Sequence, residues 1–401
     1  MKSPLFVAAL ALLSPLAAAE NFDKKGPHAV GWQDVEFFLP GGKKIDGRFY
    51  YPALEAGEAT EPDRASGPYP VVAHGHGNLG LPEDYDDLCN RVASWGFVVS
   101  SVGEGENANL LSGKQKHLLA HVDENNLVEG HYLYQMTTDA YPKAVMGHSN
   151  GGMQAQFLIK KVPAVRVVVA LTPGYEKNNG ADDNLREFTG SVLVVAGGGD
   201  VVTPNDPAEY YDNVHSARRA AYVEVAGMSH GGSTDVSDPT WGAGIGHKKE
   251  QDWVQTLTVN FLMSEVKGVE DAWLGVVGSA LELKEAEAER ETKSPLPALW
   301  VSPSPIEEDT LTLGLSGAPG DQAFLLISPR PGDALTPFGV FGLSLATMVP
   351  LFEGALDGSG WLEVETALPN PFGSAALYVQ GLTIGPDRSL LTRAVKYQAG
   401  T

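Results

Sequence analysis

The feature that most constrains the fold is an alternation, from residue 35 to residue 266, between short apolar runs and longer stretches of helical period. Strands that alternate with helices form a mostly parallel sheet with helices on both faces. No helix separates the first two runs, which favours an antiparallel start to that sheet. The expected strands are Val35–Leu39, Arg48–Tyr51, Pro70–Ala73, Phe97–Val102, Ala144–Gly147, Val165–Leu171, Ser191–Ala196 and Ala221–Val225. The expected helices are Pro82–Trp95, Lys114–Asn125, Asn150–Lys161, Asp206–Arg218 and Lys249–Val266.

The C-terminal part of the chain has a different pattern. Asp271–Lys293 is predicted to form a further helical arm, and the segment Ser294–Pro297 contains two prolines. Beyond Trp300, short alternating runs are separated by Gly, Pro, Asp and Asn, which is typical of an all-β domain. The sequence therefore predicts an α/β domain at residues 20–296 and a smaller all-β sandwich domain at residues 297–401.

The N-terminus has the pattern of a secretory signal peptide. Met1-Lys2-Ser3 precedes the apolar run Pro4–Leu16 and the small residues Ala17–Ala19. Such a signal combines a positive start, an apolar stretch of about 7 to 15 residues and small residues at the cleavage site. A membrane anchor needs about 20 apolar residues, so no stable anchor is expected. We expect residues 1–19 to be a signal peptide cleaved after Ala19, and the protein to be secreted or periplasmic.

The charge balance bears on the class of partner. The chain has 28 Lys and Arg against 50 Asp and Glu, for a formal net charge of −22. Its basic residues cluster only in pairs, so a phosphate backbone meets a repulsive field and nucleic acid is not an expected partner. The single cysteine, Cys89, excludes an intrachain disulfide.

A serine motif lies between an expected strand and an expected helix. It reads Gly147-His148-Ser149-Asn150-Gly151 and follows the apolar run that starts at Ala144. A nucleophile elbow needs a sharp turn from strand to helix that lifts the serine oxygen above the sheet, and flanking glycines remove side chains that would collide there. The motif predicts that Ser149 is a nucleophile.

A nucleophilic serine needs a histidine to take its proton and a carboxylate to orient that histidine. Asp200 directly follows the strand Ser191–Ala196 and its glycines, and His230 lies in the Gly-rich loop after the strand Ala221–Val225. Both positions lie at the carboxyl ends of strands, where α/β active sites form. Asp206 is the alternative acid, although its place before a proline also suits a helix N-cap.

The other histidines are given different roles. His148 neighbours the nucleophile and is expected to pack under the elbow. His117 and His121 are spaced i, i+4 on a predicted helix but lack a third ligand nearby, so no metal or other cofactor is expected. His76 lies in the turn after the strand Pro70–Ala73, and its backbone N–H is expected to form an oxyanion hole with that of Asn150.

Three segments together resemble a known group of proteins: Pro70–Gly77, Ala93–Val99 and Val145–Gly152. They are similar to secreted α/β-hydrolases of the cutinase-like polyester hydrolase, platelet-activating-factor acetylhydrolase and chlorophyllase group. The resemblance spans about residues 70–266. It implies an α/β-hydrolase fold and carboxylic ester hydrolysis, with the acid at Asp200, the base at His230 and the oxyanion pair at His76 and Asn150.

The sequence also departs from the polyester hydrolases of this group. They commonly carry Trp where this chain has Tyr175, and Met where it has Asn150. We expect Tyr175 and Asn78 to line the substrate cleft. Residues 103–142 also depart from that branch and are expected to form either a cleft wall or ordinary surface.

The sequence supports one main hypothesis and two alternatives. The main one is a secreted serine hydrolase that cleaves carboxylic esters, small or polymeric, through an acyl-enzyme, with lipid esters and polyesters as candidate substrates. A peptidase or acyltransferase of the same fold is one alternative. The other is a non-enzymatic protein whose C-terminal domain binds a polymer or surface, because sequence does not separate exposed aromatic patches from core.

Overall fold

The structure is a computed structural model that describes residues 22–38, 42, 44–103, 111–176, 181–242, 244–277, 288–292, 298–301, 310–336, 339–358, 360–367, 376–385, 389–392 and 395–398. The predicted signal peptide lies outside these residues, as does the segment 104–110. Within the described part, no helix is both long and apolar enough to cross a membrane.

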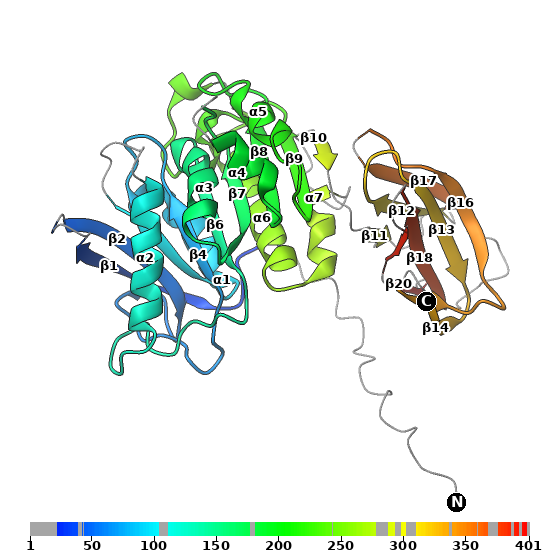
Figure 1. Cartoon of the computed structure of the whole chain (residues 1–401), viewed down its shortest axis with the longest axis horizontal. Coiled ribbons are helices and arrows are strands. Elements are labelled where there is room, and N and C mark those ends of the chain that lie inside the picture. Colours follow the sequence, from blue (N-terminus) through cyan, green and yellow to red (C-terminus); the bar gives the residue numbers. More distant parts are fainter. Residues whose placement is uncertain are drawn as a thin grey trace, which may run out of the picture.

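A large sheet forms the centre of the N-terminal domain (Figure 1). Its strand order is β10-β9-β8-β7-β6-β4-β5-β2-β1-β3. Each neighbouring pair from β9 through β8, β7, β6 and β4 to β5 is parallel. The pairs β5–β2 and β2–β1 are antiparallel, as the helix-free start of the sequence predicts. The bounds are β1 Ala29–Phe38, β2 Lys44–Ala53, β3 Gly57–Glu58, β4 Val71–Gly75, β5 Val98–Val102, β6 Lys143–His148, β7 Val165–Leu171, β8 Ser191–Gly197, β9 Arg219–Val225 and β10 Ala288–Thr292.

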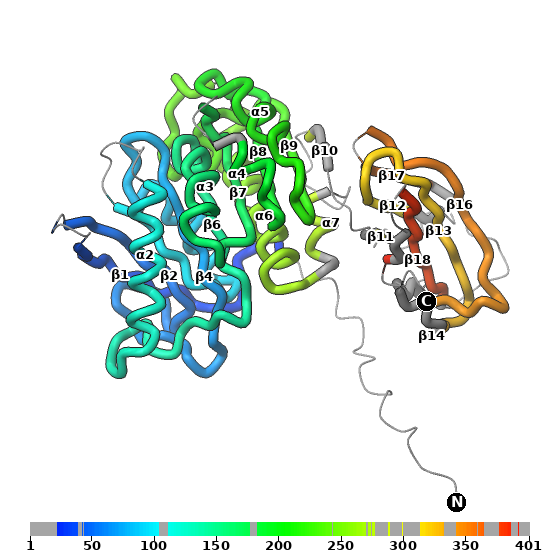
Figure 2. The backbone as a smooth tube through the Cα atoms, in the orientation of Figure 1, coloured from blue at the N-terminus to red at the C-terminus, as the bar shows by residue number. Residues whose placement is uncertain are grey.

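Helices cover both faces of this sheet. Helices α1, α6 and α7 pack on one face in one buried cluster, and α2 to α5 pack on the other face in a second. Helices α2 and α3 contact each other and lie side by side (Figures 1 and 2). Because the central strands are buried on both faces, their sequences are nearly continuous runs of Val, Leu and Ala. The bounds are η1 Pro82–Tyr85, α1 Asp86–Ser94, α2 Leu111–Asn125, α3 Asn150–Lys161, α4 Ala181–Glu187, α5 Asp206–Asp212, η3 His230–Ser233, η4 Pro239–Trp241, α6 His247–Glu265, η5 Glu270–Trp273 and α7 Leu274–Val277.

The predicted helical arm Asp271–Lys293 is wrong in its last part. Residues up to 277 are helical, but β10 is a strand that pairs antiparallel with β9. Its sequence, AERET, consists mostly of good helix formers. The open edge of β9 overrides that preference by supplying backbone hydrogen-bond partners, while Ala288 packs against the core.

The C-terminal domain is all β. One sheet has the order β11-β12-β17, a second has β16-β13-β18-β19 with β20 also on β18, and β14 pairs with β15. Leucines of β11 and β12 form one buried cluster with residues of β13 and β18, so the first two sheets pack against each other. The bounds are β11 Ala298–Val301, β12 Thr310–Ser316, β13 Gln322–Ser328, β14 Pro331–Thr336, β15 Gly339–Leu343, β16 Val349–Ala355, β17 Trp361–Ala367, β18 Ala376–Ile384, β19 Ser389–Leu391 and β20 Val395–Gln398.

The fold-class prediction, an α/β-hydrolase fold followed by a smaller all-β domain, is confirmed. The predicted domain boundary at residue 297 falls in a gap of the described residues. It lies between β10, which belongs to the large sheet, and β11, which belongs to the small one.

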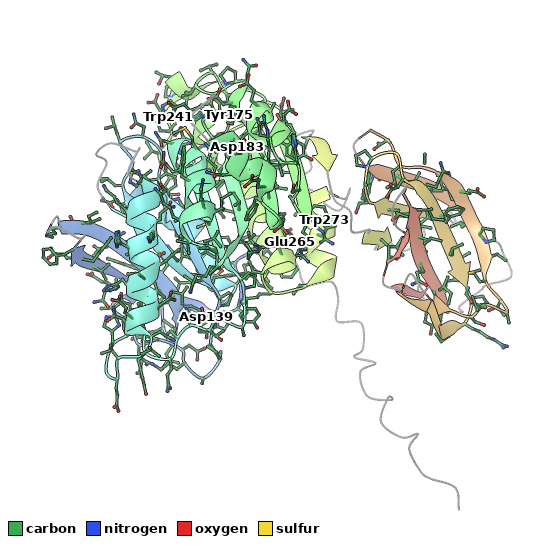
Figure 3. All side chains as sticks on the ribbon, viewed as in Figure 1. Asp139, Tyr175, Asp183, Trp241, Glu265 and Trp273 are labelled. Carbon is green, nitrogen blue, oxygen red and sulfur yellow. The ribbon has the colours of Figure 1, made fainter. Side chains whose placement is uncertain are left out.

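The parallel strands bring the candidate residues to one edge of the sheet. The turn after β4, the elbow after β6 and the loops after β8 and β9 all follow carboxyl ends of strands. In Figure 3, Tyr175 and Trp241 lie together at this edge, and Asp139, which precedes β6, lies at the opposite one.

Candidate active site

Ser149 occupies a sharp turn between β6 and α3. Its backbone has φ 51° and ψ −116°, a conformation that a residue with a Cβ rarely adopts. Neighbouring backbone fixes it: Ser149 N–H donates to Leu171 O at 2.9 Å, and Ser149 O accepts from Met153 N and Gly174 N, both at 3.0 Å. Strain of this kind persists only where the surroundings determine it, and it is concentrated at functional sites.

The glycines around Ser149 are required by close packing of the backbone. A Cβ on Gly151 would lie 2.0 Å from Gly75 O, and one on Gly147 would lie 2.5 Å from Gly151 O. Both distances are far shorter than any van der Waals contact. The elbow therefore brings α3 against the end of β4, next to the turn that holds His76.

This packing makes a paired prediction about two helical glycines. Gly151→Ala is expected to destabilise the protein by about 2 kcal/mol or more, because the added methyl group must push β4 and α3 apart. Gly113→Ala in α2 meets nothing within 4 Å, so it is expected to stabilise by about 0.5 kcal/mol through helix propensity. Urea unfolding measures the change in unfolding free energy in each variant and therefore its sign. Equal shifts would contradict the close approach of α3 to β4.

Asp200 and His230 form a buried pair. Asp200 Oδ2 lies 2.8 Å from His230 Nδ1, and the two side chains are 1% and 5% exposed. Asp200 Oδ1 accepts from Val202 N at 2.7 Å and from Thr203 N at 3.0 Å, and Oδ2 accepts from Thr203 Oγ1 at 2.8 Å. Burial by itself raises the pKa of Asp200, but the hydrogen bond and charge of His230 and the bonds from Thr203 outweigh it and lower the pKa below its usual value. Asp200 is therefore held as a carboxylate that accepts from His230.

The alternative acid, Asp206, makes different contacts. It is the first residue of α5, and its Oδ2 accepts from Tyr175 N at 3.0 Å. The structure thus brings Asp200 to His230 and uses Asp206 to fix the backbone at Tyr175.

The two predicted oxyanion donors lie just after the neighbouring strands β4 and β6. Asn150 is the first residue of α3, where backbone N–H groups have no partner within the helix. His76 follows β4, and β4 pairs with β6 with Gly75 opposite Gly147, which places the turn beside the elbow. The next amide in that turn, Gly77 N–H, donates to Tyr85 Oη at 2.8 Å.

The two predicted cleft residues are placed differently. Asn78 is exposed in the turn after β4. Tyr175 is half-buried, its Oη accepts from Asn213 Nδ2 at 2.7 Å, and its ring packs edge-on against Tyr210. Trp241 also lies next to the base, with its ring edge-on to His230 and 6.3 Å between centroids.

Sequence reasoning missed two residues at the site, Trp241 and Thr203. Thr203 Oγ1 lies 3.2 Å from His230 Nδ1 and donates to the same carboxylate oxygen. Its position three residues after an aspartate was the available signal, because such turns bring a hydroxyl back to the carboxylate. Trp241 lies eleven residues after His230, at the end of the short helix η4, and no sequence pattern indicated it.

The remaining histidines make other contacts. His121 stacks on Phe49 and lies edge-on to His131 rather than meeting His117 around a ligand. Among the described residues, no group of three or more His, Cys, Asp or Glu side chains is arranged to hold a metal ion. His148 is buried under the elbow, where it contacts Tyr85 and His230.

The chain is similar to one protein family and to several known proteins. The family model described as "PETase: PET hydrolase-like" matches residues 23–253, which is more than half of the chain. Cutinase est1 from Thermobifida alba is 25% identical over 186 residues, which cover 46% of this chain and 57% of the relative. Cutinase est2 from the same organism is 25% identical over 209 residues, 52% and 64% of the two chains. A cutinase from Thermobifida fusca (strain YX) is 24% identical over 239 residues, 56% and 73%.

The matches to the first two relatives cover less than two thirds of their length. The family model spans the elbow, the strand end that carries Asp200 and the loop that carries His230. The chain therefore belongs to the PET hydrolase-like family.

Proposed function

We propose that the protein hydrolyses carboxylic esters with Ser149 as nucleophile, His230 as general base and Asp200 as the residue that orients the base. The observation that carries the proposal is the buried 2.8 Å pair of Asp200 and His230 at the same sheet edge as the strained Ser149. A polar pair buried this completely, at the same sheet edge as a serine in a strained strand-to-helix turn, supports an activated serine nucleophile.

The proposed first half-reaction forms an acyl-enzyme. Since His230 Nδ1–H donates to Asp200, the neutral ring has its lone pair on Nε2, and Nε2 takes the proton from Ser149 Oγ as that oxygen attacks the ester carbonyl carbon. The carbonyl oxygen becomes an oxyanion, which the backbone N–H groups of Asn150 and His76 stabilise. When the intermediate collapses, the carbon–oxygen bond to the alcohol breaks, and His230 returns the proton to the leaving oxygen.

The second half-reaction restores the enzyme. His230 Nε2 removes a proton from water as the water attacks the acyl carbon, and the same donors hold the second oxyanion. Collapse breaks the bond to Ser149 Oγ, which regains its proton from His230. Each turnover consumes one ester and one water and releases one acid and one alcohol.

The proposed substrate class includes polyesters. Family membership and the cutinase relatives support an ester hydrolase that acts on polymers. Trp241, half-buried and edge-on to His230, is an apolar surface on which the acyl or aromatic part of such a substrate can rest. We also propose that residues 1–19 direct export, in which case the exported protein begins at Glu20.

Two assays test the proposal. Hydrolysis of p-nitrophenyl esters from acetyl to dodecanoyl is expected in the wild-type protein and absent in Ser149→Ala, and the chain-length optimum reports the size of the acyl site. Release of soluble products from a polyester film tests the polymer substrate with the same variant as the blank. If folded wild-type protein cleaves none of these esters, or if Ser149→Ala cleaves them at the wild-type rate, the proposal fails.

A further inference from the structure

A chain of hydrogen bonds runs beneath the catalytic residues. Tyr85, at the end of η1, is 2% exposed, and its Oη lies 2.8 Å from both Gly77 N and His148 Nδ1. His148 is 3% exposed, and its Nε2 lies 2.8 Å from His230 O. These three contacts join the turn after β4, the end of β6 and the loop after β9.

The direction of each bond in this chain follows from the groups involved. The carbonyl of His230 can only accept, so His148 Nε2 carries a hydrogen. Burial is the main cause, and the nearby His230 a smaller one, of a His148 pKa well below its usual value. The ring is therefore neutral, and its Nδ1 is an acceptor. Tyr85 O–H therefore donates to Nδ1, and its oxygen accepts from Gly77 N–H.

We propose that Tyr85 and His148 are positioning residues for the reaction, an inference that rests on the proposed function. Tyr85 fixes the turn that presents the His76 amide. His148 fixes the backbone of the base. Because His148 directly precedes Ser149, the hydrogen-bonded side chains of Tyr85 and His148 hold the nucleophile, the oxyanion turn and the base in fixed positions relative to one another.

A second donor on the same carbonyl supports this role. Thr172 Oγ1 donates to His230 O at 3.2 Å. Thr172 has φ 37°, an uncommon value for a β-branched residue, and its N–H donates to Val195 O at 2.7 Å. His230 is thus bound at its ring by Asp200 and at its carbonyl by two side chains from different strand ends.

Tyr85→Phe tests the proposal. Phenylalanine keeps the ring packing but leaves Gly77 N–H and His148 Nδ1 without the hydroxyl. Since small displacements of reacting groups lower rates by up to about 100-fold, we expect kcat for p-nitrophenyl esters to fall by about 10- to 100-fold with KM unchanged. The matched control is Tyr69→Phe. Tyr69 is 3% exposed, and its Oη donates to Asp63 O at 2.7 Å at the other end of β4.

The control separates positioning from general stability. Both variants lose one buried hydroxyl, so both are expected to have a lower Tm, but only Tyr85→Phe is expected to lower kcat. Equal kcat values for the two variants in an active wild-type background would overturn the inference. An inactive wild-type protein would instead overturn the proposed function.

Magnetic resonance of the imidazole nitrogens of isotope-labelled full-length protein gives a readout that does not depend on Tyr85→Phe folding. At neutral pH, His148 is expected to show a protonated Nε2 and an unprotonated Nδ1, with the resonance assigned by its loss in His148→Gln. In folded Tyr85→Phe, the Nδ1 resonance is expected to shift. A wild-type ring protonated on Nδ1 would contradict the bond directions and overturn the inference.

Discussion

Ser149→Ala and His230→Ala are each expected to lower kcat for ester hydrolysis by about 10⁶-fold, and the variant with both changes is expected to be no slower than either alone. The reason is that the base has no function without a nucleophile to deprotonate, and the serine is a poor nucleophile without the base. The measurement is kcat for each purified variant, with active-site titration to exclude contaminating wild-type enzyme. Residual catalysis of about 10³- to 10⁴-fold over water remains, because the oxyanion donors and substrate binding are intact.

Asp200→Asn separates the role of the acid from that of the base. Asparagine keeps the shape, but its amide nitrogen can face His230 Nδ1, and the ring then carries its hydrogen on the wrong nitrogen; a loss of about 10⁴-fold is expected. Additive losses in the Ser149 and His230 variants, or wild-type activity in His230→Ala, would contradict the assignment and move the base to another histidine.

The parts of the site that the sequence predicted are those that depend on local pattern. Ser149 lies in a motif whose glycines are needed within five residues, and Asp200 and His230 each follow an apolar strand directly. In a parallel sheet, the carboxyl ends of neighbouring strands meet at one edge, so three local signals were sufficient to bring distant residues together.

The parts that the sequence did not predict depend on long-range packing. Tyr85 and His148 are 63 residues apart, and a buried tyrosine in a short helix is usually part of the core. Nothing local indicates that its hydroxyl joins the turn after β4 to the end of β6. Similarly, residues 288–292 favour a helix by composition, and only the open edge of β9, more than 60 residues earlier, makes them a strand.

Glu265→Gln is expected to destabilise the protein by about 3 kcal/mol or more, the largest stability effect among the substitutions considered. Glu265 ends α6, its side chain is fully buried, and its carboxylate accepts from Ser191 and Arg218 on one oxygen and from Ser264 and Arg219 on the other. A glutamine places an N–H₂ group against donors on one side and removes the negative charge that faces the buried Arg219 guanidinium. Urea unfolding at neutral pH measures the loss.

Arg219 and Trp273 connect this carboxylate to a hydrogen bond between the two domains. Arg219 lies over the ring of Trp273 at 4.5 Å, and Trp273 Nε1 donates to Ser316 Oγ of β12 at 3.1 Å. Figure 3 shows Glu265 and Trp273 close together. Arg219 is therefore held between an anion on one side and an aromatic face on the other, so its release is expected to loosen the contact at Ser316 as well.

The pH dependence of the difference in unfolding free energy between wild type and Glu265→Gln distinguishes the loss of a buried charge from a simple packing defect. Burial alone raises the pKa of Glu265, but the charges of Arg219 and Arg218 and the hydroxyl donors outweigh it and lower the pKa below its usual value. A lowered pKa contributes stability that is complete above the unfolded value, about 4.3, and is lost as the pH falls through the folded value. The difference in unfolding free energy between wild type and Glu265→Gln should therefore be constant near neutral pH and become smaller below about pH 4. Glu36→Gln is the matched control: its ion pair with Lys44 is exposed and screened by solvent, so it should change stability far less than Glu265→Gln does. Two results would show that the buried carboxylate does not anchor Arg219. One is a difference in unfolding free energy that stays constant into the acid range, and the other is a loss of stability in Glu265→Gln no larger than that in Glu36→Gln.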